Sequence, residues 1–335
     1  MSRVRTMSRN HYSLGAGLGL ALALLACLLL IPASAHPREI EDAVAFQEWQ
    51  VIDANTGDRV IFEEWISDLA AGDVIYLGEE HRNHSHIEAA LKIFEGLLGR
   101  GRQPLLALEM FAWDDQAGLN HYLTDRTLER EQFLQEVHWE RNWGGSYEDY
   151  EPLINFARER QIPILALNPP RTLVRTVAKQ GLARALADPE MIRWGMTNQL
   201  LFDEPAYREI LLKQLRLCHA GLPDEVYQRM YEASVFRDEG MAKTIAESLG
   251  RTDAAATPRP GPLVSYTGGG HIQYQLPVPN RVLRRRDGLV KQATIYLIAY
   301  EPDRAEEIRK LLREHISDYV WLTPLSAHGA PRRCG

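Results

Sequence analysis

Val74-Ile-Tyr-Leu-Gly-Glu-Glu-His81 is a short apolar run that stops at ionisable residues. Three further apolar runs stop in the same way, at Glu109, Asn168 and His271. Short apolar runs bounded by Gly, Pro or Asn are typical of buried strands. In a parallel α/β sheet, ligands bind in the crevice outside the carboxyl ends of the strands. The four runs therefore predict a parallel sheet with a polar site along one edge.

Helical patterns alternate with these runs, so the predicted fold class is α/β, with a mostly parallel sheet covered on both faces. Strands are expected at 73–78, 104–110, 162–168, 263–267 and 293–300. Apolar periodicity predicts helices at 84–99, 151–160, 171–187, 189–201, 205–219, 223–233, 234–249 and 303–314. Helical insertions are expected at about 112–160 and 171–250. The second is too long for one crossover, which predicts a helical lobe over the C-terminal ends of the strands.

The chain has 335 residues, of which 45% are hydrophobic and 25% are charged, and its formal net charge is −7. This composition is ordinary for a globular protein. The negative net charge argues against a general nucleic-acid binder. We expect one domain over 36–325, followed by a polar tail at 326–335.

Residues 1–35 are predicted to be a cleaved signal peptide. Three arginines within the first nine residues precede an apolar stretch from Leu14 to Ile31, and Ala33-Ser-Ala35 has the small-x-small pattern of a signal-peptidase site. One alternative is an uncleaved anchor, because about 18 apolar residues can just span a bilayer. Another is a lipoprotein modified at Cys27. All three predict an exported protein, in the periplasm or associated with the outer membrane.

The motif Gly-x-x-His follows a predicted strand twice, at 78–81 and at 268–271. Glycine lets the backbone turn sharply off a strand end, so that His81 and His271 can point into the crevice. An imidazole in that place can act as a metal ligand, a general base or a partner for a carboxylate such as a propionate. The repeated motif therefore predicts a site that both histidines share.

Carboxylates accompany these histidines. Glu109 lies among apolar neighbours, where an unpaired charge is costly. It is therefore expected either to serve the site or to form an ion pair with Arg171 or Arg237. Glu79 and Glu80 precede His81, and we expect one to point inward and the other to cap the helix at 84–99.

Two further clusters carry open alternatives. His81, His84 and His86 could form a three-histidine metal site, but the metalloprotease pattern HExxH is absent. His84 and His86 are instead expected at the exposed start of their helix. The aromatic block at 139–150 either lines a pocket for a flat apolar ligand or fills the core. Tyrosine is also a known axial ligand of ferric haem iron.

Taken together, these motifs resemble the ChaN family of exported haem-binding proteins, over roughly residues 70–285. The motifs that carry the resemblance are Leu77-Gly-Glu-Glu-His81-(x)2-His84, Ala107-Leu-Glu-Met-Phe111, Trp143-(x)3-Tyr147-(x)2-Tyr150, Pro163-Ile-Leu-Ala-Leu-Asn168, Phe236-Arg-Asp-Glu-Gly-Met-Ala242 and Gly268-Gly-Gly-His271. The family belongs to a wider superfamily with Tiki-type proteases and erythromycin esterases.

The resemblance implies a three-layer α/β/α fold and a role in haem or iron acquisition, with an outer-membrane receptor as a candidate partner. It implies ferric haem held through tyrosine and histidine, with sharing between the two subunits of a homodimer as one arrangement. The candidate residues for haem are Tyr147, Tyr150, Tyr231, His219 and Arg237. Members of the family are often lipoproteins, whereas the sequence around Cys27 is a poor lipidation signal.

The alternative function is a hydrolase, because relatives in the wider superfamily use the equivalent histidines and glutamates for hydrolysis. Its candidate residues are His81, Glu109, His271 and Glu79. In a metal-dependent version, His81, Glu109 and His271 hold a divalent ion. In a metal-free version, His81 is the general base.

Overall fold

The computed structural model describes residues 45–197, 201–249 and 259–326. Within these residues a seven-stranded sheet has the order β1-β7-β6-β2-β5-β3-β4. Its strands are β1 (Val51–Asp53), β2 (Val74–Glu79), β3 (Arg102–Ala112), β4 (Ile164–Asn168), β5 (Arg259–Gly268), β6 (Gln292–Ala299) and β7 (Tyr319–Thr323). All neighbouring strands pair in parallel except β1 and β7. The predicted mostly parallel α/β sheet is confirmed.

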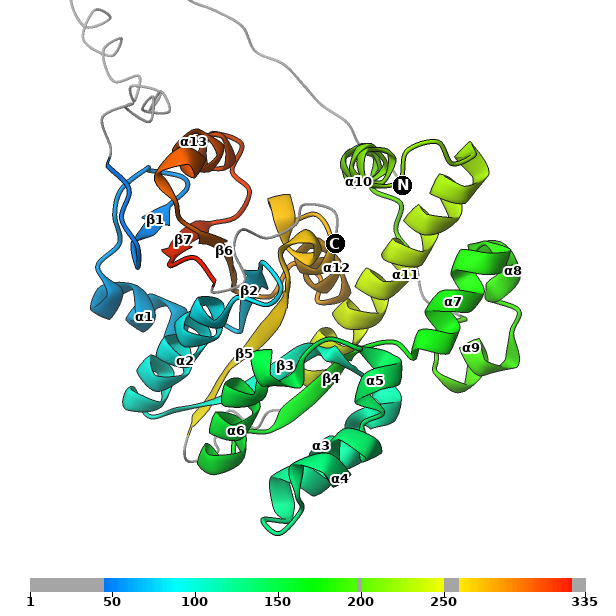
Figure 1. The fold of residues 1–335 in the computed structure, drawn as a ribbon, viewed down its shortest axis with the longest axis horizontal. Coiled ribbons are helices and arrows are strands. Elements are labelled where there is room, and N and C mark those ends of the chain that lie inside the picture. The colour runs from blue at the N-terminus through cyan, green and yellow to red at the C-terminus, as the bar shows by residue number, and fades with distance from the viewer. Residues whose placement is uncertain (1–44, 198–200, 250–258, 327–335) are drawn as a thin grey trace, which may run out of the picture. The chain divides into compact units, whose positions relative to one another are not determined.

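Helices cover both faces of the sheet (Figure 1). The helices are α1 (Phe62–Ala70), α2 (His84–Gly99), α3 (Gln116–Thr124), α4 (Arg130–Glu136), α5 (Trp139–Asn142), α6 (Glu151–Arg160), α7 (Arg171–Gln180), α8 (Leu182–Ala185), α9 (Pro189–Arg193), α10 (Pro205–Cys218), α11 (Asp224–Leu249), α12 (Val278–Arg285) and α13 (Ala305–Arg313). No helix in the described residues is long and apolar enough to cross a membrane.

The side chains of β2 point alternately to the two faces of the sheet, and each face is covered by its own layer of helices. Ile75 and Leu77 lie in one apolar cluster with residues of α1, α2 and α6. Val74 and Tyr76 lie in a second cluster with residues of α11 and α12. Successive side chains of a strand point to opposite faces. A strand that is buried on both faces therefore has apolar residues at successive positions, which is the continuous apolar run seen in the sequence.

Several elements differ from the sequence-based expectations. Helix α12 was not predicted, the helix predicted at 171–187 is divided into α7 and α8, and the helix predicted at 189–201 is observed as the shorter α9. The helices predicted separately at 223–233 and 234–249 form the single 26-residue helix α11. Strand β7 was not predicted, and it lies between β1 and β6. The predicted signal peptide at 1–35 and most of the predicted tail at 326–335 lie outside the described residues.

Helix α11 passes very close to the C-terminal end of β4. A Cβ atom at Gly240 would lie 2.6 Å from Cγ of Pro169 and 3.2 Å from the ring of Trp113. Only glycine fits this approach without displacing a rigid ring. The contact positions the preceding turn of α11, which carries Arg237 and Asp238, over the sheet.

We expect Gly240→Ala to destabilise the fold by about 1–3 kcal/mol, because the added methyl group overpacks the contact with Pro169. The matched control is Gly99→Ala at the end of α2, where a Cβ would meet nothing within 4 Å. That change should be neutral or stabilising by up to about 1 kcal/mol. Urea denaturation of both variants measures the difference. Equal midpoints would contradict the proposed close approach.

Candidate functional site

Glu79, the last residue of β2, is a buried carboxylate that accepts hydrogen bonds from several side chains. Tyr266 Oη lies 2.7 Å from Oε2, and Tyr150 Oη lies 3.1 Å from Oε1. Nδ1 of His81 lies 2.7 Å from Oε1. Both carboxylate oxygens are thus satisfied, and one of them anchors the imidazole of His81.

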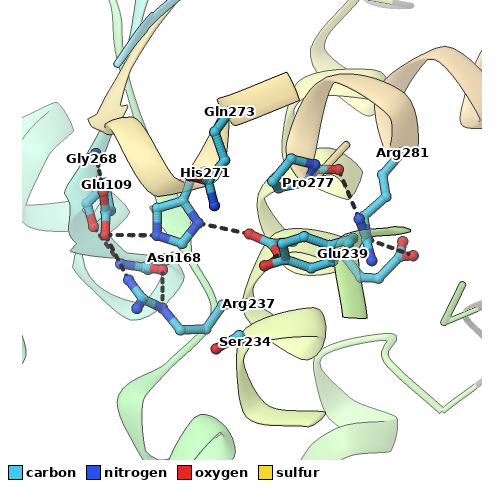
Figure 2. Close-up of polar contacts among 12 residues, drawn as sticks. Glu109, Asn168, Ser234, Arg237, Glu239, Gly268, His271, Gln273, Pro277 and Arg281 are labelled. Carbon is cyan, nitrogen blue, oxygen red and sulfur yellow. Dashed lines mark hydrogen bonds and ion pairs between the residues drawn. The ribbon is translucent and has the colours of Figure 1, made fainter. Parts of the chain in front are cut away.

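Glu109 lies within β3, which continues for three residues beyond it to Ala112. The backbone N–H of Gly268 donates to Oε2 at 2.6 Å, and Arg237 Nη2 donates to Oε1 at 2.7 Å. Nε2 of His271 lies 3.2 Å from Oε1. Figure 2 shows Arg237 and His271 converging on this carboxylate. The ion pair with Arg237 that the sequence offered as an alternative is therefore present.

His271 lies in the turn after β5 and is held on both sides. Its Nδ1 atom lies 2.7 Å from Oδ1 of Asp238 on α11, while its Nε2 atom faces Glu109. Asp238 is fully buried, and its Oδ2 atom accepts a hydrogen bond of 2.6 Å from Tyr207 Oη on α10. A chain of polar contacts thus runs from the helical lobe to the sheet.

The two Gly-x-x-His motifs lie against each other. A Cβ atom at Gly268 would lie 2.9 Å from both Cε1 and Nε2 of His81, and 3.5 Å from Oε2 of Glu109. His81 also meets the edge of Trp143, with 5.2 Å between ring centroids. The side chain of His81 is 46% exposed, whereas that of His271 is 15% exposed. His81, Glu109 and His271 therefore form one site with an open and a closed side.

Attraction between opposite charges sets the pKa values of Glu109, His271 and His81. Burial alone would raise the pKa of Glu109, but the positive charges of His271 and Arg237 hold it well below its usual range. Burial would lower the pKa of His271, but Glu109 and Asp238 raise it to about 9. Burial likewise opposes protonation of His81, but its hydrogen bond to Glu79 together with the negative charges of Glu79 and Glu109 outweighs burial and raises its pKa.

The tyrosines of the aromatic block lie inside the protein. Tyr147 packs edge-on against Trp139, and Tyr150 packs edge-on against Trp143. Both side chains are buried, and burial raises the pKa of each phenol. Tyr150 is the nearer to the site, because its hydroxyl reaches Glu79. In this conformation the block mainly fills the core.

The other predicted haem residues occupy different places. Arg237 belongs to the site, and its side chain is 31% exposed. Tyr231 is buried in the helical lobe, where its hydroxyl donates to Asp203 and its ring lies 6.2 Å from that of Tyr207. His219 is exposed at the end of α10. In the described structure neither Tyr231 nor His219 forms a hydrogen bond, ion pair or ring contact with His81 or Glu109.

Several expectations about single residues were wrong. His86 is fully buried rather than exposed, and its Nδ1 accepts from the backbone N–H of Glu80 at 3.1 Å. Glu80 does not cap α2: it accepts from Arg304 at 2.7 Å, and Asn83 is the capping residue. Arg171 does not pair with Glu109, since it is exposed and donates to the backbone carbonyl of Arg141.

The predicted metal site of His81, Glu109 and His271 is not supported. Within the part of the chain that the structure describes, no group of three or more His, Cys, Asp or Glu side chains is arranged to hold a metal ion. The physical reason is that both ring nitrogens of His271 face carboxylates. Each ring nitrogen therefore donates an N–H to a carboxylate oxygen, and no lone pair is left to bind a cation.

Sequence reasoning assigned no role to Asp238, Tyr207 or Tyr266. One signal for Asp238 was available in the sequence. Asp238 and Glu239 are adjacent acids in the middle of a predicted helix, and the residues around them are largely apolar. A buried acid requires a buried partner. The identity of that partner depends on how α10 and α11 pack, which the sequence pattern does not reveal.

Comparisons with known proteins agree on the fold. A family model described as "Haem-binding uptake, Tiki superfamily, ChaN" matches residues 65–282. The chloroplastic protein RETICULATA-RELATED 5 of Arabidopsis thaliana is 25% identical over 283 residues, which cover 78% of this chain and 35% of that protein. The chain thus spans about a third of the length of this relative. A structure of ChaN from Campylobacter jejuni with cofacially bound haem is 22% identical, with a TM-score of 0.61 over 82% of this chain and 98% of that one.

The raised pKa of His271 predicts a pH-dependent stability. Its folded value of about 9 exceeds the unfolded value near 6.5, so its contribution is fully present below about pH 6.5 and is lost as the pH rises through about 9. We expect the free energy of unfolding to fall over this range more steeply in the parent protein than in His271→Gln. Urea titrations at several pH values measure this, with the exposed His219→Gln as control. Parallel curves for the parent and His271→Gln would contradict the assignment.

Proposed function

We propose that this chain, which belongs to the ChaN family of haem-binding uptake proteins in the Tiki superfamily, is an exported protein that binds ferric haem at the C-terminal edge of its sheet. The observation that carries the proposal is the half-exposed His81, whose Nδ1 is anchored by the buried carboxylate of Glu79. Carboxylate-anchored histidines are typical metal ligands, because the second nitrogen is then oriented and more basic.

The surroundings of His81 suit a flat, anionic ligand. Trp143 meets His81 edge-on and provides an apolar wall. Arg237 is partly exposed next to Glu109, and Arg171 is exposed at the start of α7, just after the end of β4. Two guanidinium groups near the edge of the site would favour the propionates of haem, since arginine pairs well with carboxylates. Haem would supply the iron, while His81 would orient it.

A tyrosine ligand remains part of the proposal, with Tyr150 as the best candidate. Its hydroxyl is hydrogen-bonded to Glu79, the same carboxylate that anchors His81, and its ring packs edge-on against Trp143. Because Tyr150 is buried, its phenol would have to become exposed before it could bind iron. Tyr147 is buried against Phe133 and Trp139. Tyr231 and His219 belong to the helical lobe and would require a second haem position or a partner subunit.

A metal-free hydrolase is the second candidate, and the same His81–Glu79 pair favours it. The distance of 2.7 Å and the raised pKa of His81 are features of a general acid or base. Glu109 is fully engaged by Arg237, Gly268 and His271, so it would orient groups rather than exchange protons. Tests of hydrolysis on a panel of esters and peptides separate this candidate from haem binding.

Addition of hemin to the mature protein should produce a bound-haem absorption spectrum, and His81→Ala should lose affinity because the oriented nitrogen is gone. Glu79→Gln should weaken binding by about 10–100-fold, the usual effect of losing an anchoring partner. His84→Ala is the control, since His84 is exposed nearby on α2. An unchanged affinity in His81→Ala, with hydrolysis in the parent protein, would instead favour the hydrolase.

Export is the remaining part of the proposal. N-terminal sequencing of protein from the cell envelope should begin at His36 if the signal peptide is cleaved after Ala35. A mature chain that begins at a lipidated Cys27 would replace this account with the lipoprotein one. A chain that retains residues 1–35 would indicate the uncleaved anchor.

A further inference from the structure

The two histidines of the repeated motif have different surroundings. Each directs Nδ1 to a buried carboxylate at 2.7 Å, Glu79 for His81 and Asp238 for His271. Their remaining nitrogens differ. Nε2 of His271 lies 3.2 Å from Glu109, whereas Nε2 of His81 forms no ion pair with any residue that the structure describes, and the His81 side chain is about half exposed. The sequence motif is the same, but the chemistry open to each histidine is not.

Asp238 is the residue that creates this difference. It is fully buried on α11, and its two oxygens are divided between two partners: Oδ1 faces His271, and Oδ2 accepts from Tyr207 at 2.6 Å. Tyr207 is also buried, so its hydroxyl holds the carboxylate in this orientation. Such a fully satisfied buried network fixes one arrangement of its members.

We propose that Asp238, held by Tyr207, is a positioning residue that fixes the ring of His271 between two carboxylates, so that both of its nitrogens are occupied. His81 is then the histidine of the pair whose Nε2 remains open to iron or to a proton transfer. The part that concerns iron rests on the haem-binding function proposed above, and only the second test depends on it. The first test concerns His271 itself and requires no ligand.

The charges around His271 support this role. Glu109 on β3 and Asp238 on α11 face its two nitrogens, while Arg237 on α11 and His81 after β2 are the positively charged or titratable neighbours. The two carboxylates are in direct contact, whereas Arg237 contacts Glu109 rather than the ring. Attraction by the carboxylates therefore exceeds repulsion and burial, and it raises the pKa of His271 to about 9.

The first test is a titration of 15N-labelled histidines by NMR. In the parent protein His271 should carry protons on both ring nitrogens at pH 7 and titrate near pH 9. In Asp238→Asn the amide keeps the size and the acceptor oxygen but loses the charge, so the midpoint should fall by about 1–3 pH units. A midpoint at or below 6.5 in the parent protein overturns the proposal even if the variant fails to fold.

Glu239→Gln is the matched control. Glu239 is the next residue of α11 and is also buried, but it pairs with Arg281 at 3.1 Å (Figure 2). It also pairs with Arg285 at 2.7 Å. This variant should lose stability while the titration of His271 stays unchanged. If Asp238→Asn and Glu239→Gln give the same His271 titration, Asp238 has only a structural role and the proposal is wrong.

The second test uses hemin at pH 7. His271→Gln should retain the histidine-type absorption spectrum of the bound haem, and His81→Ala should lose it. The reverse result overturns this inference but leaves haem binding intact. Failure of the parent protein to bind hemin overturns the proposed function, whereas the NMR titration still decides the role of Asp238.

Discussion

The buried negative charge of Glu109 is the constraint on which the rest of the site depends. An ionised carboxylate inside a protein is costly unless it is paired and hydrogen-bonded. Here the partners come from separate segments: the N–H of Gly268 and the ring of His271 follow β5, and Arg237 lies on α11. The sheet and the long helix must therefore meet at one point, and the removal of any partner leaves a buried charge uncompensated.

This requirement explains features far from Glu109. Helix α11 can bring Arg237 and Asp238 to the sheet because Gly240 allows close contact with Pro169. Asp238 brings a second buried charge, which His271 and Tyr207 satisfy, and Tyr207 ties α10 to the same network. The helical lobe is thus linked to the strand ends by charge pairing. His81 lies on the open side of the site and keeps one nitrogen for chemistry.

The sequence was sufficient for five of the seven strands but not for the pairing of side chains. Apolar runs at β2, β3, β4, β5 and β6 predicted strands because strands buried on both faces need continuous apolar residues. The short strand β7 is bounded by Ser317-Asp318 and Pro324, so its signal was present in the sequence and was missed. Helix α11 was divided because its middle mixes buried acids with apolar residues. His81, Glu109 and His271 were predicted to converge because parallel strands end at one edge. Asp238, Tyr207 and the burial of His86 depend on helix packing, which periodicity does not encode.

The central claim is that haem iron binds beside His81 at the open side of the strand-end site. A crystal structure of the mature protein with hemin, with data collected at the iron absorption edge, tests it most directly. The account predicts an anomalous iron peak within bonding distance of Nε2 of His81, with the His271–Asp238 contact intact. An iron peak at Tyr231 or His219 in the helical lobe, or one bonded to His271, would contradict it.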